Sequence, residues 1–181
     1  MKKFVVLIVA LLVALFIVGC ASNAPTGPSA SELMASAKSN APDGTLIGQG
    51  LATGSAKERD ATLRKSEQSA RLALVKGMVS IVRDLIDESV TAGRLSASVS
   101  DEFRQIVTGL LGRSALNSAV KQDQGFGAGD TAWTVYYMEK GEVLKEINNA
   151  VNLAKKEVAA ANFNTNSFDA KYAAAIAREW K

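Results

Sequence analysis

The sequence predicts an α+β domain in which long helices pack on a small antiparallel sheet of about three strands, in two layers. Three observations lead to this prediction. Residues 45–53 and 131–139 have the composition of strands, residues 56–92 form a proline-free segment with helical periodicity, and the elements follow in the order β-α-α-β-β-α-α. All three prolines precede residue 45. The domain is therefore expected over 45–161, followed by an amphipathic helix in 162–181.

The first strand and the long helix are joined by a helix-start signal. The strand Thr45–Thr53 is interrupted by small residues, and Ser55-Ala-Lys-Glu58 follows with the spacing of a capping box. We expect one continuous helix over 56–92, ended by Gly93 and about 55 Å long at 1.5 Å per residue.

The two halves of this helix differ in composition. Before Ala70 few residues are apolar, which predicts a polar and largely solvated first half. Gly77 costs about 1 kcal/mol relative to alanine, and a close approach between helix and sheet would explain it. In the second half apolar residues return at steps of three and four, which predicts one buried face: Leu74, Val75, Met78, Ile81, Val82, Leu85 and Ile86.

A second helix is expected over 99–111. Ser98 has the side chain of an N-cap, Asp101 stands at the N3 position, and Gly112 follows as a stop. Its apolar residues share one face, which we expect to be buried: Phe103, Ile106, Val107, Leu110 and Leu111.

Two strands are expected next, over 114–122 and 131–139, joined by a glycine-rich hairpin loop at 123–130. Successive residues of a strand point to opposite faces of the sheet. One face of the second strand would therefore carry Trp133, Val135 and Tyr137, and the other Ala132, Thr134, Tyr136 and Met138.

Two further helices complete the chain. After Gly141 a third helix is expected to run to about Ala161, with a stripe formed by Val143, Leu144, Ile147, Val151, Ala154 and Val158. After a break at 162–167, the last helix carries Phe168, Tyr172, Ile176 and Trp180 at four-residue steps. This aromatic stripe either docks the helix onto its own domain or contacts another subunit or envelope protein.

The beginning of the chain has the layout of a secretory signal. Lys2 and Lys3 precede an uncharged apolar stretch over 4–18, and Gly19 precedes the only cysteine, Cys20. The stretch contains 15 residues. As a helix it would span about 22 Å, short of the roughly 30 Å hydrocarbon core, which argues against a retained transmembrane helix.

The end of this segment, Ile17-Val-Gly-Cys20, resembles a bacterial lipobox. That resemblance implies cleavage before Cys20 and lipidation of its thiol. We therefore expect a signal peptide over 1–19 and a lipidated N-terminus followed by a flexible, proline-containing tether over 20–44. A short helix from Ser29 or Ser31 to about Lys38 could interrupt the tether.

Composition excludes several functions. Removal of residues 1–19 leaves 19 basic and 18 acidic residues, so the mature chain has no concentrated positive charge for nucleic acid. The chain contains no histidine and one cysteine. Cys/His catalysis, the usual zinc sites and an intrachain disulfide are therefore excluded. We expect no cofactor.

Two glycine-rich segments invite phosphate-loop interpretations. Gly48-Gln-Gly-Leu-Ala-Thr-Gly54 has its third glycine one residue late for a dinucleotide loop, so a glycine-rich strand is favoured. Gly125-Phe-Gly-Ala-Gly-Asp130 lacks the Lys-Ser/Thr of a P-loop and the carboxylates of a calcium loop. It is interpreted as a flexible hairpin that places Phe126 at its tip, where the ring could contact a partner.

Two groups of polar residues have compositions that occur in catalytic sites. Ser118 and Lys121 have the spacing of a Ser/Lys nucleophile pair, but in a strand these positions face opposite sides. Asp84, Asp87 and Glu88 lie near Arg83 and Arg94 and are interpreted as an ordinary solvated face. The sequence therefore predicts no enzyme.

The layout resembles the small bacterial outer-membrane lipoproteins of the Lpp-twenty type, a family that includes lipoproteins associated with flagella. The shared features are the lipobox ending at Cys20, the glycine-rich strand 47–54, the Ala/Arg-rich helix segment 69–75 and the strand 133–138. The resemblance covers roughly residues 45–155. It implies an α+β domain, no enzymatic activity and no catalytic residues.

Two functions from different classes follow. The first is a non-enzymatic, lipid-anchored protein at the periplasmic face of the outer membrane, with a structural or assembly role through self-association or an envelope or flagellar partner. Ala21 after the cysteine resembles the pattern of outer-membrane lipoproteins. The second is a lipid-anchored binding module whose cleft, rimmed by Tyr136, Tyr137 and loop 123–130, holds a small molecule or a peptidoglycan strand.

Overall fold

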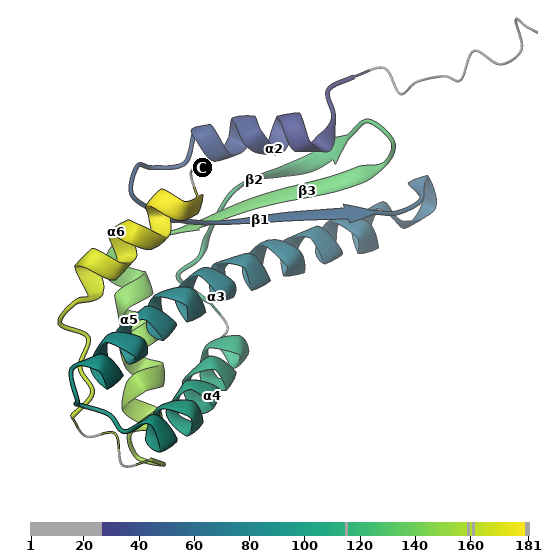
Figure 1. Ribbon diagram of the computed structural model, residues 1–181. Helices are drawn as coiled ribbons and strands as arrows, with labels where there is room; N and C mark the ends of the chain where they lie inside the picture. Colours follow the sequence, from purple (N-terminus) through teal and green to yellow (C-terminus); the bar gives the residue numbers. More distant parts are fainter. Residues whose placement is uncertain (1–26, 115, 159, 161, 180–181) are drawn as a thin grey trace, which may run out of the picture.

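A three-stranded antiparallel sheet of order β1-β3-β2 lies between the short helix α2 and the long helix α3 (Figure 1). The structure is a computed structural model, and it describes residues 27–114, 116–158, 160 and 162–179. The elements are α2 (Ala30–Ser39), β1 (Leu46–Thr53), the 3-10 turn η1 (Ala56–Glu58), α3 (Arg59–Thr91), α4 (Ala97–Arg113), β2 (Val120–Gly127), β3 (Thr131–Met138), α5 (Lys140–Ala154) and α6 (Phe168–Glu179).

The predicted α+β class with a small antiparallel sheet is confirmed. The central strand β3 also has the predicted alternation of faces. Trp133 and Val135 pack with α2, whereas Tyr136 and Met138 belong to the large core on the α3 side. Each side of β3 is covered, so the strand is buried at nearly every position.

The helix α3 lies directly against the backbone of β1, because two positions of that strand have no side chain. A Cβ on Gly48 would come within 2.1 Å of the Ala70 carbonyl oxygen, and one on Gly50 within 2.0 Å of the Ser66 carbonyl oxygen. The glycine-rich segment is therefore a strand, as predicted, and the close helix-sheet approach is present. The glycines that permit it lie in the strand.

The prediction of a solvated first half of α3 is wrong on the side that faces the sheet. Thr62, Ser66 and Ala70 are buried there, although two of them are polar. The Ser66 hydroxyl lies 2.7 Å from the Thr134 hydroxyl of β3 and donates to the Leu63 carbonyl. Small polar side chains thus fill the narrow space that the glycines of β1 leave.

The second half of α3 packs with α4, α5 and α6 around large apolar side chains, as its periodicity predicts (Figure 1). The buried set includes Met78, Ile81, Val82, Leu85 and Ile86. Gly93 follows the helix with a φ of +68°, which fits its predicted role as the stop. Phe103 of α4 meets Phe163 with ring centroids 4.9 Å apart and closes this core.

The second face of the sheet is covered by α2, within the segment that we expected to be a tether. Ala30, Ala37 and Ala41 are buried against Ile47, Trp133 and Val135. The helix has the expected position, and Ser29 forms a complete capping box with Glu32. The packed unit therefore includes α2 and does not start at Thr45, since small alanine side chains let α2 lie close to the strands.

The edge strand β2 differs most from its predicted position. β2 covers 120–127 rather than 114–122, so most of the expected hairpin loop is strand. The turn is reduced to Ala128-Gly-Asp130, in which Gly129 and Asp130 have positive φ. The residues of β2 are glycine-rich and polar because the strand lies at the edge, where few side chains need to fill a core.

Several helices begin or end a few residues from the positions that the sequence predicted. The cap of α4 is Ser96, whose hydroxyl accepts from the Val99 N–H, rather than Ser98. η1 precedes α3, and the expected capping box contributes only a hydroxyl contact of 3.4 Å between Ser55 and Glu58. α5 ends at Ala154, well before the predicted end near Ala161.

Candidate functional site

The aromatic stripe of the last helix lies mostly inside the fold. Phe168 and Tyr172 are buried in the main core, and the Tyr172 hydroxyl donates to the Gly44 carbonyl at 2.8 Å. Ile176 is half-buried at the margin of the same core. Trp180 and Cys20, the other two terminal residues that the sequence singles out, lie outside the described residues. The described part of the stripe therefore docks α6 onto its own domain.

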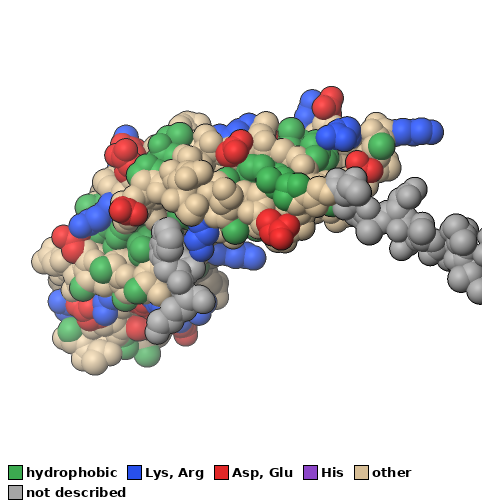
Figure 2. Space-filling view, turned by 90° about the horizontal axis from the view of Figure 1, so that it is seen from above, with side chains coloured by type: hydrophobic (Ala, Val, Ile, Leu, Met, Phe, Trp, Pro, Cys, Tyr) green, Lys and Arg blue, Asp and Glu red, His purple; other side chains and the backbone are tan. Residues whose placement is uncertain are grey.

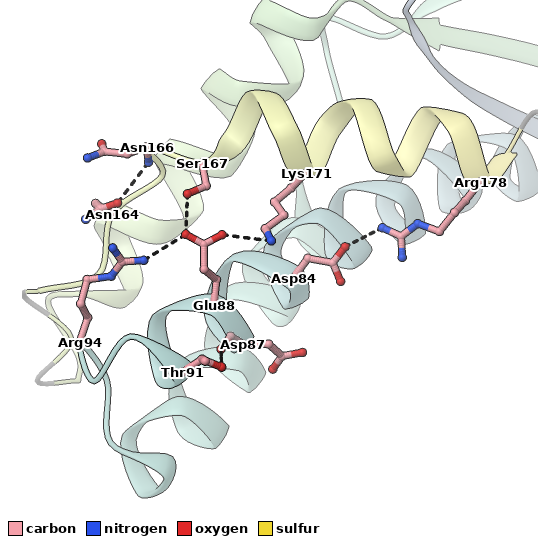
Figure 3. Close-up of polar contacts among 10 residues, drawn as sticks. All are labelled: Asp84, Asp87, Glu88, Thr91, Arg94, Asn164, Asn166, Ser167, Lys171 and Arg178. Carbon is pink, nitrogen blue, oxygen red and sulfur yellow. Dashed lines mark hydrogen bonds and ion pairs between the residues drawn. The ribbon is translucent and has the colours of Figure 1, made fainter.

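The acidic cluster of α3 holds α6 in place through ion pairs (Figure 3). Glu88 accepts a hydrogen bond from the Ser167 hydroxyl at 2.5 Å, and its second oxygen lies 3.0 Å from the Lys171 ammonium. Arg94 approaches the same carboxylate at 3.3 Å. One turn away, Arg178 lies 2.6 Å from Asp84.

These contacts change the ionisation of Glu88. The pKa of Glu88 is lowered from 4.5 to about 2. The hydrogen bond from the Ser167 hydroxyl is the largest cause, and the hydrogen bond from Lys171 is the second. Glu88 is therefore a carboxylate throughout the physiological range and cannot serve as a general acid. Its role in this geometry is to hold the start of α6.

The prediction of an ordinary solvated face for Asp84, Asp87 and Glu88 does not include their partners on other helices. Asp87 pairs with Arg104 of α4 at 2.6 Å, so the cluster links two helices to α3. The spacing of these charges in the sequence indicates the pairing between α3 and α6. Asp84 and Glu88 are four residues apart, and Lys171 and Arg178 are seven apart. Each pair occupies one helical face, as two facing helices with matched charges require.

Beside these contacts lies an open groove between α6, the Asp43–Gly44 turn and the start of α5. Its volume is about 560 Å³. Tyr172, Ala173, Ile176 and Ala177 form its α6 wall, and Asp43, Lys140 and Asp169 stand at its rim. Lys140 and Asp169 pair at 2.8 Å while both remain largely exposed. An apolar wall with charged groups at the rim can accept an apolar side chain or ring of a ligand or partner.

The second site that the sequence suggested, a cleft rimmed by Tyr136, Tyr137 and loop 123–130, is not formed. The two tyrosines are neighbours on β3 and face opposite sides of the sheet. Tyr136 is buried beneath α3, with the Arg71 guanidinium 4.8 Å from its ring centroid. Tyr137 packs near α2.

Phe126 lies in β2 rather than at a loop tip. The Arg59 guanidinium lies over its ring, 3.9 Å from the centroid, and Phe126 is half-buried. Arg59 also approaches Asp130 of the turn at 3.6 Å. Phe126 therefore joins the β2–β3 hairpin to the start of α3, which leaves one part of the ring for an outside contact.

The Ser118 and Lys121 pair has no catalytic geometry. A hydrogen bond from Ser118, followed by contacts with Lys145, lowers the pKa of Glu142, whereas Lys121 pairs with Glu67 at 2.5 Å. Each residue thus has a separate acidic partner. Over the described residues, no group of three or more Cys, Asp or Glu side chains is placed to hold a metal ion.

The surface around α2 carries charges of both signs and no extended field of one sign (Figure 2). Within the described part of the chain, no helix combines the length and apolar character needed to cross a bilayer. No protein-family model matches the chain, and no curated protein matches its sequence. The resemblance to the Lpp-twenty type therefore stays a prediction.

Proposed function

We propose that this chain is a lipid-anchored, non-enzymatic protein of the bacterial envelope, with a structural or assembly role at the periplasmic face of the outer membrane. The observation that carries the proposal is the lipobox-like sequence ending at Cys20, which follows a short apolar segment and stands nine residues before Ser29, the cap of α2. Three acyl chains on such an N-terminus would anchor the domain firmly, since one chain alone binds only marginally.

Mass spectrometry of the protein expressed with its signal segment tests the anchor. The expected product begins at Cys20 and carries the mass of a diacylglycerol and an N-acyl chain. Cys20→Ala should abolish the lipid mass and leave the signal uncleaved, whereas Ser22→Ala, a matched change nearby, should alter neither. A full-length, unlipidated wild-type protein would refute the anchor.

The assembly role is tested by crosslinking in intact envelopes. The α6 groove is the apolar surface on which we expect a partner or second copy, so Ile176→Glu should remove the crosslinked species. Lys76→Glu changes an exposed residue in the middle of α3 and serves as the control. A wild-type protein that yields no crosslinked species would contradict this role.

A second candidate is a binding module for a small molecule or a peptidoglycan strand. The α6 groove favours it, because Ala173, Ile176 and Ala177 present an apolar surface beside the charged pair Lys140–Asp169. Sedimentation with purified peptidoglycan and a thermal-shift screen distinguish this candidate from the first. Binding that Ile176→Glu abolishes would favour the module over the assembly role.

A further inference from the structure

The packed chain begins at one end of the molecule, at the turn between β2 and β3. The Ala128 N–H donates to the Pro28 carbonyl at 3.1 Å. A Cβ on Gly127 would come within 2.1 Å of the Ala30 nitrogen, so the start of α2 lies directly on the end of β2. The same end of the molecule carries η1 and the first turn of α3 (Figure 1). We call the segment 56–65 together with the turn 128–130 the hairpin end.

The length of chain before this point limits how far the hairpin end can lie from a lipid on Cys20. Pro28 stands eight positions after Cys20, a distance of eight residue steps along the chain. Fully extended, they reach about 28 Å. The 33 residues of α3 extend about 50 Å in the other direction, toward α4 and α6. When the axis of α3 is roughly perpendicular to the membrane, the hairpin end is therefore the part of the domain closest to the lipid.

The charge of this end suits an anionic surface. The hairpin end contains four basic side chains, all exposed, and the three acids Glu58, Asp60 and Asp130, which leaves a net charge of +1. Arg59 pairs with Asp130 yet its side chain keeps 53% of its exposure. Figure 2 shows Lys and Arg side chains projecting from this end, with Asp and Glu side chains beside them. The N-terminus of α3 adds the positive end of a helix dipole.

We propose that the hairpin end rests on anionic phospholipid headgroups of the membrane that holds Cys20. This inference depends on the proposed lipid anchor. Lys57, Arg59, Arg64 and Lys65 contact the phosphates, and the exposed part of Phe126 lies at the headgroup level beneath the Arg59 guanidinium. The α6 groove then points away from the membrane, free to meet a partner. Each cation near an anionic surface contributes about 1 kcal/mol. Glu58, Asp60 and Asp130 oppose this attraction, and the lipid anchor holds the domain at the surface where the remaining bias acts.

Hydrogen exchange of the full, lipidated protein in vesicles tests this orientation. The protein is extracted from membranes and incorporated into phosphatidylcholine vesicles with or without phosphatidylglycerol. Peptides from 55–66 and 126–131 should exchange more slowly with phosphatidylglycerol, and peptides from 88–97 at the other end of α3 should not. Equal protection at both ends, or none at either, would overturn the proposal.

Charge reversal separates headgroup contact from the effect of the tether alone. Lys57→Glu with Lys65→Glu should reduce the docked population about fivefold per charge. Lys76→Glu with Lys156→Glu alters exposed residues elsewhere and should have no effect. Circular dichroism shows that both variants fold. Protection that is insensitive to the first pair would refute headgroup contact.

The anchor can fail separately from the orientation. If mass spectrometry finds no lipid on Cys20, the proposed function is refuted. The same exchange measurement is then made on residues 20–181 coupled through the Cys20 thiol, the only one in the chain, to a maleimide phospholipid. Protection of the hairpin end in that sample would retain the surface, and its absence would reject it.

Discussion

The two halves of α3 are held by different means, although they belong to one continuous helix. Toward its N-terminus α3 lies against the bare backbone of β1, and small side chains such as Ser66 and Ala70 fill the contact. Toward its C-terminus large side chains such as Ile81 and Ile86 fill a core shared with α4, α5 and α6. The packing of the first half depends on the short distance between the α3 and β1 backbones. The packing of the second half depends on the volume of its buried apolar side chains.

This difference shows why apolar content alone misjudges burial. A side chain is buried when something covers it, and a glycine strand can cover a serine as completely as leucines cover an isoleucine. Both Ser66 and Ile81 have no exposed surface. The following predictions would break or sharpen the comparison.

The largest effect is expected where closeness is essential. In Gly50→Ala the new Cβ would lie 2.0 Å from the Ser66 carbonyl oxygen and 2.5 Å from the Ala70 nitrogen. Backbone atoms cannot rotate away, so α3 must separate from the sheet, and we expect a loss of about 4 kcal/mol or more in the free energy of unfolding. Urea denaturation of the mature chain measures it.

The matched control is Gly109→Ala, in the interior of α4. A Cβ there meets nothing within 4 Å. This substitution should stabilise the protein by about 0.5–1 kcal/mol, because alanine loses less backbone entropy in a helix. A small loss in both variants would show that α3 does not lie as close to β1 as described.

In the volume-filled half, Ile81→Ala should cost about 3 kcal/mol through lost apolar contact and the cavity left behind. Leu72→Ala provides the comparison on the same helix, since Leu72 is 57% exposed. It should change the free energy of unfolding by less than about 0.5 kcal/mol. Similar losses in the two variants would argue against the packing of this half.

The hydrogen bond between Ser66 and Thr134 gives a smaller effect. Ser66→Ala leaves the buried Thr134 hydroxyl without this partner and should cost about 1–2 kcal/mol. Thr134→Val combined with Ser66→Ala removes both hydroxyls and should recover most of that loss. A double-mutant cycle measures the coupling, and strictly additive losses would mean that the bond contributes nothing.

The smallest effect is expected at the exposed contacts of α6. The pKa of Glu88 is lowered from 4.5 to about 2, so its contribution to stability is fully present above about pH 4.5 and disappears as the pH falls toward 2. The protection factors of the α6 amides, which remove the intrinsic exchange rate at each pH, should therefore fall over this range in the wild type. Glu88→Gln should exchange faster already at pH 6 and lose this pH dependence. An unchanged profile in Glu88→Gln would assign the pH effect to another group.

Much of the fold could be predicted because local patterns express it. Each of these patterns is local in the sequence and predicts one element. They are the alternation in β3, the apolar stripe from Leu74 to Ile86, and the glycine after α3. The position of β2 could not be predicted, because its polar, glycine-rich residues resemble a turn until β3 and α2 are placed beside them. The cover that α2 provides was missed for the same reason, since alanines and prolines also suit a tether.

The site was less predictable than the fold. Cys20 can be recognised from its neighbours in the sequence alone, because a signal segment is read as a linear pattern. The α6 groove, by contrast, requires Gly44 and Tyr172, which are 128 residues apart. Only the folded chain shows that Tyr136 and Tyr137 face opposite sides of the sheet, so no common cleft can form from them.

The position of α2 has a mechanical consequence if the N-terminus is fixed in a membrane. A pull on the far end of the molecule would be transmitted to the chain at Pro28, where α2 begins. The hydrogen bond from Ala128 and the contact with Gly127 would bear the force first. α2 would then peel from the sheet turn by turn, while the core behind α3 stays intact. The helix would act as an extensible element between the membrane attachment and the rest of the domain.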